Sequence, residues 1–181
     1  MKLTTKYKKY LTQIKRLYHD AFPRSERMPF FIIRRECRKG SAEIFAVVSN
    51  SGRFGGFAVT MRRGDIVMLS YFAICPQLRD RGIGSRVIKA LMRRFKDERF
   101  ILEIEDVNEA CENPEIRQRR REFYLKNGMV SAGFTAHVFM SDLEVLTSGK
   151  PVTFEEYRAL YHSRRGSRVA LNVTLKSQNN A

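Results

Sequence analysis

Two closely spaced glycines near the middle of the chain follow an apolar segment and are flanked by arginines. The segment that they belong to reads Arg79, Asp80, Arg81, Gly82, Ile83, Gly84 and Ser85. The first N–H groups of a helix lack intrahelical partners and carry a partial positive charge, so they suit an anion. Glycines remove the Cβ atoms that would keep a phosphate away from these groups. With Arg79 and Arg81 adding full positive charges, the segment predicts a diphosphate-binding turn.

The elements on either side of this turn must be a buried strand and an amphipathic helix. Nearly all residues from Ile66 to Ile74 are apolar, as expected of a strand buried on both faces, and Pro76 ends it. After the turn, apolar residues recur at helical spacing, with basic residues on the other side. The apolar set is Ile83, Val87, Ile88, Leu91, Met92 and Phe95, and the basic set is Arg86, Lys89, Arg93 and Arg94.

Two widespread phosphate-binding motifs fit the turn less well. A Walker A loop has a Lys followed by Ser or Thr after its last glycine, whereas Gly84 is followed by Ser85 and Arg86. A dinucleotide fingerprint would need a glycine in place of Val87 and a first glycine close to the strand end. Glu103 does lie about twenty residues further on, where a ribose-binding acid would stand. Dinucleotide binding therefore remains an alternative.

A third pattern, Arg/Gln-x-x-Gly-x-Gly/Ala, is met by Arg79, Gly82 and Gly84. Placed between a buried strand and a long helix, it resembles motif A of the GCN5-related N-acetyltransferase (GNAT) family. A second match follows, because the segment from Phe123 to Met129 resembles the family's later helix, which ends in Phe-Tyr and Asn-Gly. The two motifs occur in the order that the family has.

This resemblance implies an acetyl-CoA-dependent N-acetyltransferase that acts on a primary amine of a small molecule or peptide. It also implies a mixed α/β fold, with a mostly antiparallel central sheet flanked by helices and split near the cofactor-binding strand. The diphosphate of coenzyme A would lie on the N–H groups of residues 81–85. Tyr124 matches the tyrosine that protonates the leaving thiolate, and Asn127 would either bind the pantetheine arm or cap its helix. The arm would pair with the strand at Phe72, Ala73 and Ile74.

Acidic residues supply candidates for deprotonating the acceptor's ammonium group. The alternation in Phe100 to Glu105 predicts a strand that carries Glu103 and Glu105 on one face. Carboxylates on a core strand are costly unless they face a cleft, so Glu103 is the first candidate for the general base and Glu105 the second. From Glu103 to Glu115 there are six acids and no Lys or Arg, which suits either a solvated loop or a site that attracts a cationic amine.

The chain of 181 residues carries a net charge of +15. Coenzyme A could use part of this charge, and nucleic acid is a competing partner. The alternative function is therefore a catalytically inactive protein of the same fold that binds nucleic acid through its basic surface. A solvated cationic face is the third interpretation. The basic clusters lie at residues 34–39, 117–121 and 164–168.

Cysteine use and hydropathy bear on the compartment. Cys37, Cys75 and Cys111 lack metal-ligand spacing, so we expect reduced thiols in a cytoplasmic protein and no metal site. The segment from Met1 to Tyr10 is basic and has no apolar core, so no signal peptide is evident, and no apolar run approaches membrane-spanning length. We expect a monomer or homodimer with one acetyltransferase-like domain over residues 1–165. Residues 166–181 would form an edge strand or a basic, polar tail.

The remaining elements are predicted from periodicity and from helix and turn signals. No strand is expected before the first helix, which Thr4 or Thr5 could cap and which ends before Pro23. A last helix from Pro151 to His162 begins with a capping box of Thr153 and Glu156. The other expected elements are a helix from Pro29 to Gly40, strands at Glu43 to Val48, Phe54 to Met61, Val130 to Met140 and Glu144 to Thr147, a helix at Ile116 to Lys126, and an edge strand through Val169, Leu171, Val173 and Leu175.

Overall fold

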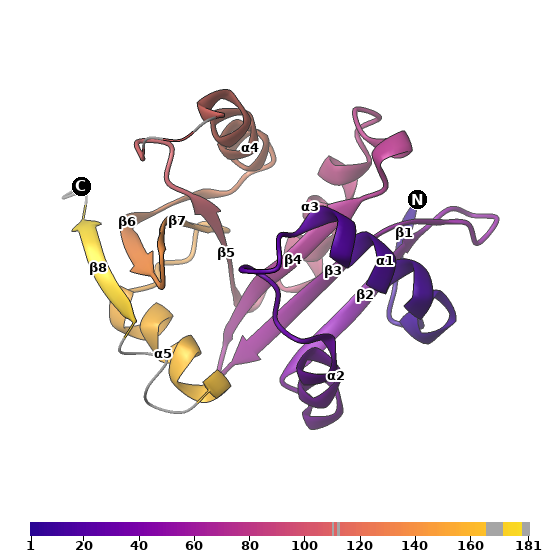
Figure 1. Cartoon of the computed structure of the whole chain (residues 1–181), viewed down its shortest axis with the longest axis horizontal. Helices are drawn as coiled ribbons and strands as arrows, with labels where there is room; N and C mark the ends of the chain where they lie inside the picture. Colours follow the sequence, from indigo (N-terminus) through magenta and orange to yellow (C-terminus); the bar gives the residue numbers. More distant parts are fainter. Residues whose placement is uncertain (110, 112, 166–171, 179–181) are drawn as a thin grey trace. The chain divides into compact units, whose positions relative to one another are not determined.

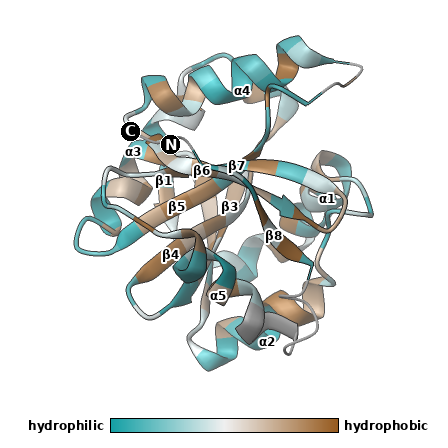
Figure 2. Ribbon diagram, turned by 90° about the vertical axis from the view of Figure 1, so that its left-hand side faces the viewer, coloured by the Kyte–Doolittle hydropathy of each residue, from teal (hydrophilic) through white to brown (hydrophobic). Residues whose placement is uncertain are grey.

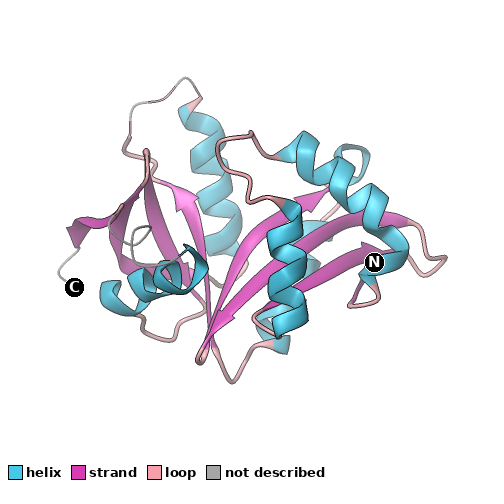
Figure 3. Cartoon of the chain, turned by 60° about the horizontal axis from the view of Figure 1, so that its bottom comes forward, coloured by secondary structure: helices cyan, strands magenta, loops and turns pink. Residues whose placement is uncertain are grey.

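Two stretches of the chain, Met1–Arg94 and Phe95–Ala181, form separate compact units (Figure 1). The computed structural model describes residues 1–109, 111, 113–165 and 172–178. The strand pairings described within each unit are antiparallel, and each unit combines strands with helices (Figure 3). The predicted fold class, a mixed α/β fold with mostly antiparallel strands and flanking helices, is confirmed.

The N-terminal unit holds a sheet with the strand order β1-β2-β3-β4. Its strands are β1 (Lys2–Thr4), β2 (Ala42–Val48), β3 (Phe54–Arg63) and β4 (Ile66–Ile74). Its helical segments are η1 (Tyr7–Tyr10), α1 (Leu11–Ala21), α2 (Phe30–Lys39), η2 (Pro76–Leu78) and α3 (Ile83–Arg94). The predicted succession of buried strand, turn and helix is confirmed, with the short η2 between β4 and the turn.

The start of the chain differs from the prediction. Lys2–Thr4 forms β1, which pairs with the end of β2, so the expectation that no strand precedes the first helix was wrong. Three residues, two of them polar, carry no periodicity; the strand forms because the edge of β2 presents backbone groups that need partners. The expected cap by Thr4 or Thr5 was also wrong, since helical structure begins with η1, whose N-cap residue Lys6 makes no side-chain capping bond.

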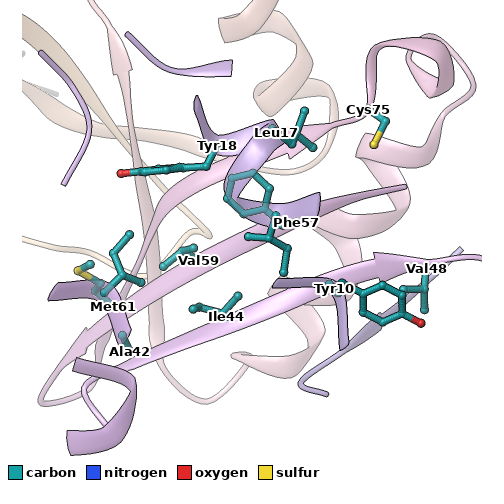
Figure 4. Packing of buried hydrophobic residues seen from close by; sticks show 14 residues of the cluster. Tyr10, Leu17, Tyr18, Ala42, Ile44, Val48, Phe57, Val59, Met61 and Cys75 are labelled. Atoms are coloured by element: carbon teal, nitrogen blue, oxygen red, sulfur yellow. The ribbon is translucent and has the colours of Figure 1, made fainter. Parts of the chain in front are cut away.

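The core of the N-terminal unit lies between the sheet and the apolar stripe of α1. Ile14, Leu17 and Tyr18 are buried on α1 at the spacing of one helix face. They pack against buried strand residues of β2 and β3, including Ile44, Phe57 and Val59 (Figure 4). Burying an aliphatic or phenyl side chain of this size contributes about 1.5 to 3 kcal/mol. This packing fixes α1 on the sheet next to β4.

A β-bulge interrupts β4. Val59 of β3 pairs with Tyr71, whereas the next residue, Thr60, pairs with Leu69. Ser70 is therefore the extra residue of the bulged strand. A bulge bends its strand and increases the local twist. The part of β4 after the bulge, up to Ile74, therefore runs at an angle to the part before it.

The C-terminal unit holds a second sheet with the strand order β5-β7-β6-β8. Its elements are β5 (Arg99–Glu105), α4 (Pro114–Lys126), β6 (Val130–Val138), β7 (Ser141–Thr147), α5 (Phe154–Arg165) and β8 (Val173–Gln178). The predicted strands at Val130 to Met140 and Glu144 to Thr147 correspond to β6 and β7, which pair with one another. β8 pairs with β6; of the predicted edge strand, Val169 and Leu171 lie outside the described residues.

The predicted capping box at the start of α5 is confirmed by two reciprocal bonds. The Glu156 N–H donates to Thr153 Oγ1 at 3.2 Å, and the Thr153 N–H donates to Glu156 Oε2 at 3.0 Å. Arg99 holds the same carboxylate through an ion pair of 2.6 Å to Oε1. Within the part of the chain that the structure describes, each helix is too short or too polar to cross a bilayer.

Candidate functional site

The turn between β4 and α3 has a backbone that suits anion binding. Gly82, which precedes the helix, has a φ of +66°, and Asp80 has a φ of +57°. A Cβ added to Gly82 would meet only the Arg86 guanidinium, at 3.8 Å, so the space before the helix is open. A side chain at this position would instead be disfavoured by the left-handed backbone, by about 1 to 2 kcal/mol.

The first amides of α3 follow directly after the turn. The Arg86 N–H donates to the Gly82 carbonyl at 3.2 Å, which is the i to i−4 bond that opens the helix. The N–H groups of Ile83, Gly84 and Ser85 precede this bond and therefore have no acceptor within α3. Together with the helix dipole, they form a place for an anion of the size of a phosphate. The prediction of a diphosphate-binding turn at residues 79–85 is therefore compatible with this backbone and stays a prediction.

Two arginines brace this turn. The Arg79 Nε donates to the Ile74 carbonyl at 3.3 Å, across the end of β4. The Arg86 Nη2 donates to the Arg81 carbonyl at 3.4 Å. Arg79 thus links the turn to the end of β4, Arg86 links it to α3, and both place positive charge near it. Arg81 itself is exposed.

β3 holds the end of β4 by a very close backbone approach. A Cβ on Gly56 would lie 2.4 Å from the Ala73 carbonyl oxygen, which no side chain allows. The neighbouring Gly55 carbonyl accepts a bond of 3.0 Å from the Cys75 N–H. Of the predicted pantetheine-binding residues, Phe72 is half-buried, whereas Ala73 and Ile74 are buried. The paired glycines in the β3 sequence were a signal for such an approach, and the sequence analysis missed it.

Tyr71, one residue past the bulge, ties β4 to the loop between α1 and α2. Its hydroxyl donates to the Glu26 carbonyl at 3.0 Å and accepts from the Met28 N–H at 2.9 Å. Tyr18 of α1 donates to the Met28 carbonyl at 2.9 Å, and its ring meets that of Tyr71 edge to face with centroids 4.8 Å apart. Burial raises the pKa of Tyr18 well above its usual range. The loop at residues 23–29 therefore has a defined position beside β4.

In the C-terminal unit, Glu103 on β5 is held by two tyrosines of α5. Its Oε1 accepts a bond of 2.7 Å from the Tyr157 hydroxyl and a second, short bond from Tyr161. The two tyrosines are four residues apart on α5, with ring centroids separated by 5.6 Å. Burial, and then the charge of Glu103, raise the pKa of Tyr157 well above its usual range. The Tyr157 hydroxyl therefore remains a protonated donor.

Glu105, the second predicted base, has different surroundings. It pairs with Arg120 Nη1 at 2.7 Å and with Arg117 Nε at 3.5 Å, both from α4. Arg117 also binds Glu109 at 3.0 Å. The two predicted bases therefore contact different helices, α5 for Glu103 and α4 for Glu105.

Two acids of this stretch, Glu105 and Glu109, pair with arginines of α4, a helix that Figure 2 shows as mostly hydrophilic. Besides the pairs of Glu105 and Glu109, Arg121 makes a two-pronged contact with Glu144 on β7, at 2.7 and 3.1 Å. These ion pairs favour a structural role for the carboxylates over a site that attracts a cationic amine. The spacing of the arginines on one face of α4 was a signal that the sequence analysis did not use.

Tyr124 lies half-buried on the same helix. Burial raises its pKa to about 12, and the positive charge of Arg120 offsets part of that effect. Its ring meets that of Phe123 edge to face, with centroids 5.1 Å apart. Its phenol is therefore protonated throughout the neutral range.

Asn127 ends α4. Its Nδ2 donates to the Phe123 carbonyl at 2.7 Å, and its N–H donates to the Tyr124 carbonyl at 3.0 Å. Gly128 follows with a φ of +94°, as helix C-termini commonly require. Of the two roles considered for Asn127, capping its own helix is the one for which the structure provides contacts.

The three cysteines are free thiols. Cys37, Cys75 and Cys111 form no disulfide, and burial raises the pKa of the Cys37 and Cys75 thiols, so both remain protonated at neutral pH. Among the described residues, no group of three or more His, Cys, Asp or Glu side chains is placed to hold a metal ion.

The predicted cofactor residues are thus contiguous in the N-terminal unit, from Phe72 to Ser85, while Tyr124, Glu103 and Glu105 belong to the C-terminal unit. A sequence model described as the Acetyltransferase (GNAT) family matches residues 11–129. The chain therefore belongs to the GNAT acetyltransferase family, and the predicted family membership is confirmed. Its members are enzymes that transfer acetyl groups. No curated protein sequence matches the chain significantly.

Solved structures share the fold at low sequence identity. A protein from Bacteroides thetaiotaomicron assigned to the GNAT acetyltransferases is 19% identical, with a TM-score of 0.72 over 94% of this chain and 99% of that one. A variant of the spermidine N-acetyltransferase SpeG from Vibrio cholerae is 13% identical, with a TM-score of 0.60 over 81% and 94%. Spermidine N-acetyltransferase from the same organism in complex with CoA and spermine is 11% identical, with a TM-score of 0.52 over 64% and 70%.

Proposed function

We propose that this enzyme transfers the acetyl group of acetyl-CoA to a primary amine of a small molecule or a peptide. The observation that carries the proposal is the start of α3, where the amides of Ile83, Gly84 and Ser85 have no acceptor within the helix and Gly82 leaves the space before them open. This geometry suits the diphosphate of coenzyme A. The cofactor supplies a thioester whose carbonyl carbon is open to attack by an amine.

The pantetheine arm would bind along the backbone at the end of β4. Phe72, Ala73 and Ile74 follow the bulge at Ser70, and Gly56 lets β3 approach close to the Ala73 carbonyl. An extended arm pairing with this backbone would place its thioester near an N–H group of Ala73 or Ile74. Such an N–H stabilises the oxyanion that forms when the amine attacks.

Glu103 is the group that we assign to the acceptor's proton. An amine must lose its proton before it can attack, and a positioned carboxylate can accept that proton directly or through water. The hydroxyls of Tyr157 and Tyr161 fix the orientation of this carboxylate through Oε1. Glu105 is engaged by two guanidinium groups, so we assign it a structural role.

Tyr124 is the group that we assign to the departing thiolate. An alkyl thiol has an ordinary pKa of about 8.5, whereas burial raises the pKa of Tyr124 to about 12. Complete proton transfer from this phenol to the thiolate is therefore unfavourable. The phenol stabilises the developing negative charge on sulfur by donating a hydrogen bond, and solvent supplies the proton that the thiol finally carries. We assign Asn127 to the end of α4 rather than to cofactor binding.

The three free cysteines fit a reducing compartment, and we place the protein in the cytoplasm. The acceptor is a primary amine whose identity a panel can establish. Because spermidine N-acetyltransferases share the fold, spermidine and spermine belong in that panel, beside amino acids, aminoglycosides and peptides with free N-termini or lysines.

Two measurements test the proposed function. Acetyl-CoA should raise the melting temperature, since a ligand that binds the native state stabilises it, and the reduced nicotinamide dinucleotides should not. Release of free thiol from acetyl-CoA should then rise with at least one amine of the panel. If a nicotinamide dinucleotide stabilises the protein while acetyl-CoA does not, the dinucleotide alternative replaces this proposal.

A further inference from the structure

A groove of about 940 Å³ runs between the N-terminal segment and the outer face of α3, within the N-terminal unit. Six basic side chains line it and no acidic residue does: Lys2, Lys6, Arg86, Lys89, Arg93 and Arg94. Arg86, Lys89 and Arg93 of α3 are three and four residues apart, so they lie along one face of the helix. The groove is thus a continuous line of positive charge.

Most of this charge is not neutralised by the protein. Arg94 pairs with Glu43 at 2.6 Å. Among the described residues, no carboxylate forms an ion pair with Lys2, Lys6, Lys89 or Arg93, and all four side chains are exposed. On α4, by contrast, Arg117, Arg120 and Arg121 each have a carboxylate partner. An unmatched line of cations in a groove therefore calls for an external anion.

A second groove, of about 570 Å³, extends the basic surface along the N-terminal segment. It shares Lys2 and Lys6 with the first groove and adds Lys8 and Lys9. Tyr7, which is partly exposed, also lines it. Cations that follow a backbone, interleaved with an aromatic ring on which a base can stack, are the features of single-stranded nucleic-acid binding.

The shape of the charge favours a linear polyanion. From Arg86 to Arg93 the helix advances roughly 10 Å at 1.5 Å per residue, so its cations form an extended line and not a compact cluster. A membrane surface fits less well, because lipid-binding surfaces combine cations with exposed apolar side chains. The large exposed apolar side chains of the described residues line neither groove: Phe31, Ile116, Val130, Phe139, Met140 and Leu175.

We propose that the groove beside α3 binds the phosphate backbone of a single-stranded nucleic acid. The contacts run along α3 from Arg86 towards its C-terminus and across Lys2 and Lys6. Arg86, at the start of α3, also braces the glycine turn, whereas Lys89 and Arg93 lie further along the helix. Nucleic-acid binding through Lys89 and Arg93 therefore does not depend on the turn or on acetyl transfer.

Fluorescence anisotropy with labelled single-stranded RNA, measured over a series of salt concentrations, tests this inference. The test variant is Lys89→Gln with Arg93→Gln. The control is Arg34→Gln with Arg38→Gln, which removes two exposed charges at the same i, i+4 spacing on α2. Each single-strand phosphate contact contributes about 0.7 to the slope of log K against log salt. The test variant should therefore lose about 1.4 from that slope and bind roughly tenfold more weakly at low salt, while the control retains wild-type binding.

Further binding measurements distinguish single-stranded nucleic acid from duplex DNA and from anionic membranes. Single-stranded DNA of the same sequence should bind comparably if the backbone is what the groove recognises, and duplex DNA should bind more weakly. The inference is overturned if the wild type fails to bind the RNA at low salt, if both variants weaken binding equally, or if anionic vesicles bind where the RNA does not. Melting curves of both variants with acetyl-CoA show whether the fold and the glycine turn are intact, so a failed acetyltransferase assay leaves this test valid.

Discussion

The Tyr157 hydroxyl donates a hydrogen bond of 2.7 Å to Oε1 of Glu103, joining α5 to β5. The two residues are far apart in the sequence, and the bond distinguishes Glu103 from Glu105 and Glu109, which pair with guanidinium groups. The hydrogen bonds that the Glu103 carboxylate accepts from Tyr157 and Tyr161 come from hydroxyl groups and not from cations. This surrounding suits a group that must accept a proton from an ammonium ion.

Replacing Glu103 by glutamine tests that role. The amide oxygen of Glu103→Gln can still accept bonds from both tyrosines, so the fold should be retained while proton acceptance is lost. We expect kcat to fall roughly 10² to 10⁴-fold, and the pH–rate profile of acetylation to lose its acidic limb. Glu105→Gln is the control, with a small effect on kcat. An unchanged pH–rate profile in Glu103→Gln would remove Glu103 from the mechanism.

Tyr124→Phe removes the proposed hydrogen bond to the thiolate. We expect kcat to fall by about 10² with little change in the KM for acetyl-CoA. Because the pKa of Tyr124 is about 12, its ionisation should not limit the wild-type rate below about pH 11. Tyr10→Phe, which deletes the 3.0 Å bond to the Gly52 carbonyl, is the control: it should lower the melting temperature and leave kcat unchanged. Equal kcat values for Tyr124→Phe and wild type would exclude the assigned role.

Gly82→Ala tests the diphosphate turn. Gly82 and Gly64 both have left-handed backbones, with φ values of +66° and +57°, so alanine at either position should cost about 1 to 2 kcal/mol of stability. Gly82→Ala should in addition raise the KM for acetyl-CoA, because the methyl group and the altered backbone disturb the amides that open α3. Gly64→Ala, in the β3–β4 turn, should not. The same KM in the two variants would separate the turn from cofactor binding.

The capping box of α5 is a prediction about stability alone. Thr153→Ala removes the acceptor of the 3.2 Å bond from the Glu156 N–H and should lower the free energy of unfolding by about 1 kcal/mol. Thr5→Ala, at a position expected to cap the first helix but found not to, should leave it unchanged. Urea denaturation of both variants measures the difference, and a cost at Thr5 equal to that at Thr153 would contradict the structure.

Asp142 links three strands and should make stability depend on pH. Hydrogen bonds from Lys176 on β8, and then from His137 on β6, lower the pKa of this carboxyl. A depressed folded-state pKa contributes stability at neutral pH, and this contribution is lost as the pH falls through that pKa. Asp142→Asn should therefore be less stable than the wild type at pH 7, and the gap should close at pH values below the ordinary pKa of 3.8. A gap that does not narrow on acidification would contradict the assignment.

Local patterns in the sequence predicted most elements, because each carries its own signal. The apolar run at Ile66 to Ile74, the glycine turn and the apolar stripe of α3 are all visible over a few residues, and so is the Thr153 capping box. Gly40, with a φ of +78°, ends α2 as expected. Each of these signals comes from residues that are close together in the sequence.

Features made by residues far apart in the sequence could not be predicted in this way. β1 forms against the edge of β2, the bulge at Ser70 depends on register with β3, and the partners of Glu103 lie on α5. The ion pairs of α4 also escaped notice, because an acidic stretch next to a basic helix has the same composition whether or not the two are in contact.

The hydroxyl of Tyr71 can donate only one hydrogen bond, and it donates that bond to the Glu26 carbonyl. The Met28 N–H occupies one of its lone pairs. A bound molecule that accepted a hydrogen bond from Tyr71 would have to replace the Glu26 carbonyl as the acceptor. Binding of such a molecule would therefore be coupled to release of the segment between α1 and α2 from β4. Tyr71→Phe removes the hydroxyl oxygen, so the Glu26 carbonyl and the Met28 N–H would lose this partner and would have to bind water.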